Sequence, residues 1–277
     1  LYAWTLAINN NWNFKNAFVL SVGMAICAMS YYNSYVWVLA SIFIYFITYF
    51  YQNKKDYKGF IRLSAFIVVV TLVLMGYLFA RHLYLYHDLL GFKVSREYAD
   101  IYANEAFKPE NRGNPSNLGY SLWHMLFDMG WLSSTYRSFI GFFGPMAYPL
   151  NNNVYRFYTL FFIVAFIGFV YFVFKLIANA KHQKPTLDWI VFYISLAFCG
   201  VMAVGLSMYN SYFSDYQPQG RYCFPLLPAL AIFVAKGFET LISLIKSERA
   251  QYAAVSSICT ILFMISFSSY INVLLVS

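Results

Sequence analysis

Charged residues are scarce in this chain: aspartate, glutamate, lysine and arginine together make up 11% of its 277 residues. An ordinary soluble domain carries about 25% charged residues. Hydrophobic residues make up 61% of the sequence and aromatic residues 22%. This balance excludes an ordinary soluble domain and indicates an integral membrane protein.

The sequence also lacks the common catalytic and cofactor motifs. It has no Gly-x-Ser-x-Gly elbow, no phosphate-binding loop, no dinucleotide fingerprint and no His-Glu-x-x-His zinc motif. Its cysteines have no metal-ligand spacing and lie in or beside apolar runs, as small packing residues do: Cys27, Cys199, Cys223 and Cys259. The residues themselves therefore identify no cofactor and no metal site.

The basic residues account for the net charge of +8 without a nucleic-acid partner, because no basic groove or base-stacking sheet is visible in the pattern. Most of them gather in four short segments: Lys15; Lys54, Lys55, Lys58 and Arg62; Lys175, Lys181 and Lys184; Lys236, Lys246 and Arg249. All four segments fall on one side of the membrane if the spans below are right. The positive-inside rule makes that side cytoplasmic, where anionic membrane lipids are the expected partners.

Long apolar runs predict an all-α polytopic membrane protein with seven complete transmembrane helices, each about 20 residues long. The predicted spans are 16–31, 35–51, 60–80, 154–174, 188–208, 222–243 and 252–276. The apolar segment 1–8 is too short to cross, so we expect it to be the stub of a helix whose upstream portion is missing. The predicted organisation is therefore 1–81 with the stub and three helices, 82–153 as a large extracytoplasmic loop, and 154–277 with four helices.

The predicted loop 82–153 is far longer than a simple connection. It includes charged residues such as Glu110 and Arg112, which we interpret as solvated. The apolar residues at helical spacing between 118 and 129 predict an interfacial helix, which Gly141, Gly144, Pro145 and Pro149 end. Trp123, Trp131 and Tyr136 offer flat faces to a sugar or an isoprenoid, although an interfacial aromatic belt has the same composition.

His124 and Asp128 stand four residues apart on this predicted helix, so both can face one cleft. Pairs of this kind are also common on wet helix surfaces. Spacing alone leaves both interpretations open.

The segment 215–228 places a single arginine where a polar turn meets a long apolar run. Arg221 can hold a lipid phosphate by a charge-assisted contact, and Gly220 allows the backbone to approach a ligand closely. The alternative is an arginine that snorkels to the lipid headgroups and anchors its helix.

Three landmarks in this order resemble a family of polytopic bacterial membrane proteins of unassigned function. The family is similar to the GT-C class of polyprenyl-phosphate-sugar-dependent glycosyltransferases. The landmarks are the helix pair within 16–51, the segment 138–150, and Gln219-Gly-Arg-Tyr222 followed by a Phe-Pro-Leu-Leu-Pro sequence. The resemblance covers nearly the whole chain, but only the second half of such a protein.

The resemblance implies transfer of a sugar from a polyprenyl-phosphate donor to a cell-envelope glycan or lipid, at the outer face of the bacterial plasma (inner) membrane. It places Arg221, with Gln219 and Tyr222, near the donor's phosphate. The catalytic acidic residue of that class belongs to an external loop upstream of Leu1, and a divalent metal is compatible with the class. Together with the residues above, the predicted substrate-binding set is Arg221, Gln219, Tyr222, Gly220, His124 and Trp123.

Two other functions stay open. One is a ligase or polymerase of lipid-linked oligosaccharides, which also works at an outer loop. The other is a multi-pass transporter or scaffold without enzymatic activity. Ion-coupled transporters usually carry charged groups in their spans, and the predicted spans show almost none.

Overall fold

A computed structural model describes residues 1–30, 32–105, 108, 111, 113–144, 146–179 and 186–275. Five residues of the predictions above lie outside the described residues: Glu110, Arg112, Pro145, Lys181 and Lys184. The chain forms two compact units, and each contains two separate stretches of sequence. Unit 1 comprises Leu1–Met125 and Thr186–Gln217, and unit 2 comprises Leu126–Pro185 and Pro218–Ser277.

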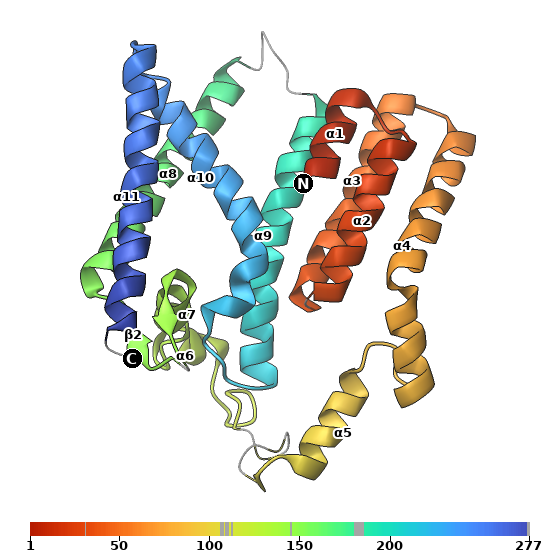
Figure 1. Cartoon of the computed structure of the whole chain (residues 1–277), viewed down its shortest axis with the longest axis vertical. Helices are drawn as coiled ribbons and strands as arrows, with labels where there is room; N and C mark the ends of the chain where they lie inside the picture. Colours follow the sequence, from red (N-terminus) through yellow and green to blue (C-terminus); the bar gives the residue numbers. More distant parts are fainter. Residues whose placement is uncertain are drawn as a thin grey trace. The chain divides into compact units, whose positions relative to one another are not determined.

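Unit 1 is built from helices (Figure 1). They are α1 (Tyr2–Asn10), α2 (Phe14–Ser30), the 3-10 turn η1 (Tyr32–Ser34), α3 (Tyr35–Asn53), α4 (Tyr57–Tyr86), α5 (Phe92–Tyr102) and α9 (Leu187–Phe213). Helix α2 packs on α4 and α3 packs on α9, while the short α1 contacts α2, α3 and α9. The boundary between the units falls inside α6 (Leu122–Phe127).

Tryptophan side chains hold α1 in this unit. Trp4 is 1% exposed, and its ring lies between those of Trp37 and Phe192 at centroid distances of 5.6 and 6.1 Å. Its indole N–H donates to Ser41 Oγ at 3.1 Å, which satisfies the one polar atom that burial would otherwise strand. The segment predicted as a helix stub is thus a packed helix of unit 1.

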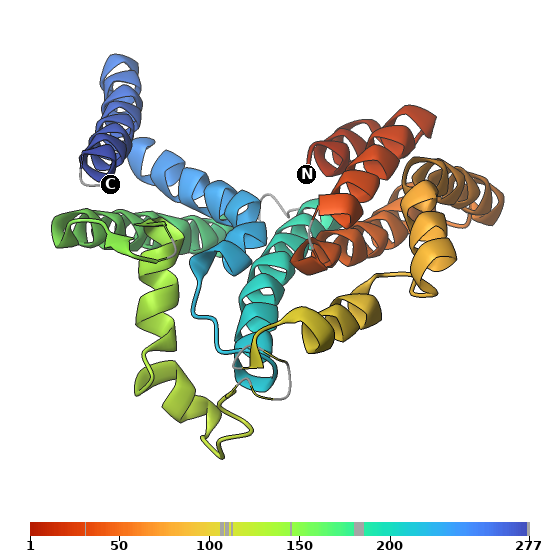
Figure 2. The ribbon, with the colours of Figure 1, turned by 60° about the horizontal axis from the view of Figure 1, so that its bottom comes forward.

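Unit 2 contains α7 (Trp131–Ile140), a two-stranded hairpin of β1 (Phe142–Phe143) and β2 (Tyr148–Pro149), α8 (Asn152–Asn179), the 3-10 segment η3 (Gly220–Leu226), α10 (Leu227–Ile242) and α11 (Glu248–Leu274). The strands are antiparallel, with Phe142 opposite Pro149. Helices α8 and α10 cross in close contact (Figure 2).

Two glycines make this crossing possible. A Cβ on Gly168 would lie 2.2 Å from the Gly237 carbonyl oxygen, and a Cβ on Gly237 would lie 2.0 Å from the Ala165 carbonyl oxygen. Both distances are far below van der Waals contact, so only glycine fits at either position. Close backbone approach over small residues is a usual way for helices to associate in a membrane.

Six helices among the described residues are long and apolar enough to cross a membrane, which confirms the all-α multi-pass membrane protein. They are Tyr35–Asn53, Tyr57–Tyr86, Asn152–Ala178, Leu187–Phe213, Gly220–Ile242 and Glu248–Val273. The predicted span 16–31 corresponds to α2, which has 17 residues. Its rise is about 26 Å at about 1.5 Å per residue, short of the ~30 Å hydrocarbon layer. The seventh span therefore stays a prediction.

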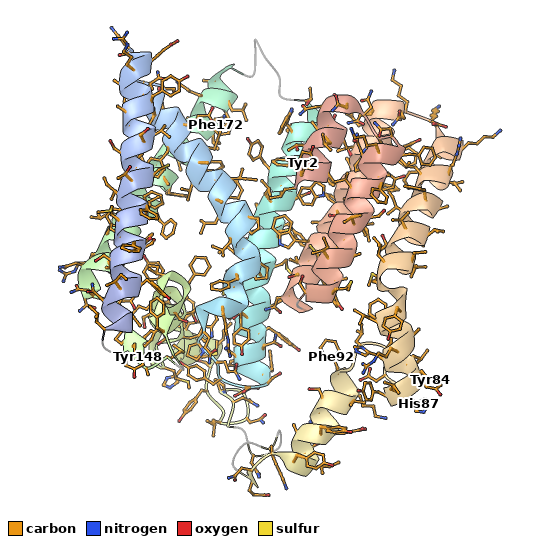
Figure 3. All side chains as sticks on the ribbon, in the orientation of Figure 1. Tyr2, Tyr84, His87, Phe92, Tyr148 and Phe172 are labelled. Atoms are coloured by element: carbon orange, nitrogen blue, oxygen red, sulfur yellow. The ribbon has the colours of Figure 1, made fainter. Side chains whose placement is uncertain are left out.

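The predicted loop 82–153 contains more regular structure than the sequence indicated. The helix expected in this region is present as two helices, α6 and α7, because Gly130 at φ 72° takes the left-handed conformation between them, and an interfacial position for them stays a prediction. Helix α4 continues to Tyr86, and α5 follows it, as the labels Tyr84, His87 and Phe92 mark in Figure 3. The extracytoplasmic location of this region stays a prediction.

In each unit, a basic side chain of a predicted basic segment lies over an aromatic ring. In unit 1 the Arg62 guanidinium lies 5.0 Å from the centre of the Phe14 ring, next to Lys15. In unit 2 the Lys236 ammonium lies 5.0 Å from the centre of the Phe172 ring, one turn before Lys175. The placement of the four basic segments on one side of the membrane stays a prediction.

Candidate functional site

The segment that carries Arg221 is fixed on α7 through its glycine. The Gly220 N–H donates to Ser138 Oγ at 3.1 Å, and the glycine is buried. A Cβ at this position would lie 2.1 Å from the Phe139 backbone nitrogen and 2.3 Å from its Cα. The sequence predicted close approach of a ligand here. The structure explains the glycine differently, because the backbone that approaches it closely is that of α7.

Arg221 is exposed and stands at the beginning of the candidate span Gly220–Ile242. Its guanidinium carbon lies 5.0 Å from the centre of the Tyr222 ring, and Nη2 donates to Tyr222 Oη at 3.1 Å. Among the described residues this is its one hydrogen bond, so most of its five N–H donors have no partner there. Gln219, extended and half-buried, precedes it, and its carbonyl accepts the Tyr222 N–H at 3.2 Å.

A second arginine of unit 2 lies on α7, one residue before Ser138. The Arg137 guanidinium carbon is 4.7 Å from the centre of the Tyr155 ring, and Nη2 is 3.4 Å from Asn152 Oδ1. Its Nε is buried without a hydrogen-bond partner among the described residues. The sequence gave no reason to single out Arg137, because its neighbours on α8 are about 15 residues further along the chain.

Tyr155 connects this arginine to the hairpin. Its hydroxyl donates to the Gly141 carbonyl at 2.7 Å and accepts the Leu150 N–H at 3.0 Å. The Tyr155 ring is thereby held as a platform beneath Arg137 by both ends of the hairpin. A cation over the face of a desolvated aromatic ring is stabilised by about 1–2 kcal/mol.

The sequence around α7, the first turns of α8 and η3 is positively charged. It carries Arg137, Arg156 and Arg221, with Asp128 as the one acidic residue of unit 2 before α10. Three guanidinium groups against one carboxylate leave a formal charge of +2 on this part of the unit. Phosphate is the common biological anion that such a set recognises.

A groove of about 740 Å³ lies on the same unit, between the hairpin, the start of α8 and the last turns of α11. Tyr148, labelled in Figure 3, forms part of its wall. Its lining is mostly apolar, with polar groups from Asn151, Ser268, Ser269 and Asn272. The groove combines an apolar surface with hydrogen-bonding groups, as an amphiphilic ligand requires. One of its lining residues, Leu150, donates its N–H to Tyr155, whose ring lies beneath Arg137.

Trp123 and His124 belong to unit 1, and the segment from Gln219 to Tyr222 belongs to unit 2, so the predicted set is described as two separate groups. The His124 ring lies on the Tyr120 ring at a centroid distance of 4.6 Å and 30°. The Tyr120 carbonyl in turn accepts the Tyr212 hydroxyl at 2.9 Å, which connects this segment to the end of α9.

The predicted aromatic platforms differ in burial. Trp123 is 70% exposed. Trp131 is 1% exposed, so its prediction as a platform was wrong: it is a core residue of unit 2. The Tyr136 hydroxyl is paired with Thr159 Oγ1 at 2.6 Å.

Sequence reasoning missed one buried acidic residue. Asp188 is 6% exposed in the first turn of α9, where the predicted spans were described as almost free of buried charge. The signal was an acidic residue placed directly at the beginning of an apolar run. Among the described residues, no three His, Cys, Asp or Glu side chains lie close enough together to hold a metal ion.

These observations define a multi-pass α-helical membrane protein with an arginine-bearing segment at the start of one candidate span. Comparisons with family models, with curated proteins and with solved structures give no match. The candidate site is therefore interpreted from its own chemistry.

Proposed function

We propose that the protein is a GT-C-type membrane glycosyltransferase, which moves a sugar from a polyprenyl-phosphate donor to a cell-envelope glycan or lipid at the outer face of the bacterial plasma membrane. The observation that carries the proposal is the position of Arg221. It is an exposed guanidinium, oriented by Tyr222, at the beginning of a candidate span. A lipid phosphate whose hydrocarbon chain enters the membrane presents its charge at that level.

The proposed chemistry uses the arginine on the leaving group. When the bond between the sugar's anomeric carbon and the phosphate oxygen breaks, its electron pair stays on the phosphate. A guanidinium already fixed at that place stabilises the developing charge more than it stabilises the bound donor. The acceptor hydroxyl forms the new bond, and its proton passes to a base that the proposal does not assign to a residue of this chain.

Other features of unit 2 support an amphiphilic phosphate ligand. Arg137 adds a second guanidinium on the same unit, and the groove of about 740 Å³ offers apolar walls to an isoprenoid chain. On unit 1, Trp123 stays a predicted sugar platform and His124 a predicted polar contact, separate from the phosphate contacts proposed for unit 2. The basic ends of the units are proposed to contact anionic lipids on the cytoplasmic side.

The test measures consumption of radiolabelled polyprenyl-phosphate sugars by membranes that contain the full chain. We expect Arg221→Ala to lower the rate by about 10²–10³-fold, as removal of one fixed transition-state donor does. Arg249→Ala is the matched control: Arg249 is also an exposed arginine, but it begins α11, and we expect no change in rate.

Three results would overturn the proposal. The first is that no polyprenyl-phosphate sugar is consumed. The second is equal activity of the Arg221 and Arg249 variants. The third is consumption of diphosphate-linked oligosaccharides alone, which would identify a ligase or polymerase. If Arg221→Ala also leaves the cell's glycan composition intact, a transporter or scaffold replaces the enzyme.

A further inference from the structure

Three helices of unit 1 meet at a buried polar cluster. Helix α1 contributes its carboxyl-terminal turn, α3 its last turn and α9 its first turn, and Figure 1 shows these helices side by side. Gln52 Nε2 donates to the Ala7 carbonyl at 3.1 Å and to Asp188 Oδ2 at 3.2 Å. One amide group thus joins all three helices.

The remaining polar atoms of the cluster are acceptors. Both hydrogens of the Gln52 amide are used by the two bonds above, which leaves Gln52 Oε1 and Asp188 Oδ1. Both oxygens are buried, and neither has a hydrogen-bond partner among the described residues. A buried acceptor without a donor is unfavourable by about 1–3 kcal/mol, and more when it is charged.

The three helices around the Asp188 carboxylate supply no positively charged side chain. Helices α1 and α3 contain no charged side chain, and Asp188 is the only one in α9. No salt bridge among the described residues includes it. Leaving one buried charge unpaired is strongly destabilising, and the amino-terminal end of α9 offsets only part of that cost, so a bound cation would stabilise an ionised Asp188.

The end of α1 adds to the negative potential. The last four carbonyl groups of a helix have no partner within it and carry its partial negative charge, and Ala7 is one of these in α1. The helix stops abruptly because Asn11 is left-handed, with φ 60°. Helix ends and carbonyl groups of this kind bind small cations in membrane proteins.

We propose that Asp188, Gln52 and the Ala7 carbonyl form a binding site for one small monovalent cation, of which Na⁺ is the probe. Asp188 Oδ1 and Gln52 Oε1 supply the two free oxygens, and water completes the coordination. A single carboxylate balances a single positive charge, whereas divalent cation sites in proteins normally use several carboxylates. The bound ion ties α1, α3 and α9 together and is independent of the proposed glycosyl transfer.

The test is thermal unfolding of the purified full chain in detergent, with NaCl exchanged for choline chloride at constant ionic strength. A ligand that binds only the folded state raises Tm as its concentration rises. We expect Tm to rise by a few degrees between about 1 and 100 mM Na⁺, and one equivalent of ²²Na⁺ to bind. Asp188→Asn should abolish both effects.

Asp56→Asn is the matched control, since Asp56 is an exposed carboxylate at the start of α4 that accepts the Gly59 N–H at 2.9 Å. It should lower Tm by a constant amount and keep the Na⁺ response. A flat Na⁺ response of the wild-type chain would overturn the proposal without any variant. A Tm that depends on pH between 5 and 8 but not on Na⁺ would do the same, and would indicate a proton in place of the ion.

Discussion

Replacing Gly220 by alanine tests whether the arginine segment is held by its backbone contact with α7. The new methyl group would stand 2.1 Å from the Phe139 nitrogen and 2.3 Å from its Cα. Carbon in ordinary contact needs about 3.5 Å or more, so the two backbones must separate by about 1 Å. Both contacts are with main chain of a helix, which cannot rotate away as a side chain can.

The expected loss of stability has two parts. Overpacking of a tight contact costs about 1–3 kcal/mol. The bond from the Gly220 N–H to Ser138 Oγ, 3.1 Å long, breaks when the segments separate, which adds about 1 kcal/mol. We therefore expect Gly220→Ala to lower the free energy of unfolding by about 2–4 kcal/mol.

The assay is thermal unfolding of the full chain, with Gly205→Ala as the matched control. Gly205 lies inside α9, and a Cβ there meets no atom within 4 Å. Alanine is the better helix residue by about 1 kcal/mol, so the control should be neutral or slightly more stable. Equal unfolding temperatures of the two variants would refute the packing argument. Under the proposed function, Gly220→Ala should also lose donor consumption, because Arg221 moves with its neighbour.

Two further predictions concern the helices. Gly237→Ala should separate α8 from α10 and lower the unfolding temperature as Gly220→Ala does, since its Cβ would lie 2.0 Å from the Ala165 carbonyl oxygen; an unchanged temperature would contradict this packing. Desolvation raises the pKa of Asp88. Hydrogen bonds from backbone N–H groups at the start of α5 outweigh this effect and hold the pKa below its usual value; the bond from the Lys93 N–H is 2.6 Å long. The carboxylate therefore stabilises α5 above about pH 4 and loses this effect as pH falls through the lowered value. Amide exchange in α5 should be faster in Asp88→Ala than in wild type at pH 6 and equal in both at the acidic limit, and equal exchange at pH 6 would refute the cap.

The sequence predicted what depends on local pattern. The long apolar runs became helices near their expected bounds. The break at Gly130 was missed, although a glycine inside a helical pattern can mark a helix end. Helix α5 was missed because it lies among charged residues, although Asp88 and Gly91 before it are typical of a helix start.

Contacts between distant segments could not be predicted. Position 220 requires glycine because the backbone of Phe139, on another helix, lies against it. The buried Asp188 carboxylate is hydrogen-bonded to Gln52, which is 136 residues away in the sequence. The hydrophobic pattern of either segment contains no information about which distant residue it will contact. Arg221 could therefore be singled out from the sequence, whereas the contacts of Arg137 and the burial of Asp188 could be recognised only in the folded structure.

Whether Arg221 binds a phosphate or only anchors its helix in the membrane can be tested with lysine at this position. An anchoring side chain extends along its helix toward the headgroups, and lysine does this as well as arginine. In the structure the guanidinium instead lies against the Tyr222 ring and donates to its hydroxyl, which fixes the planar group with its other donors free. Lysine has neither the planar shape nor the paired donors needed to repeat that arrangement. Arg221→Lys should therefore keep membrane insertion and stability but lose most of the transferase activity, whereas full activity of this variant would leave the anchor as the sufficient explanation.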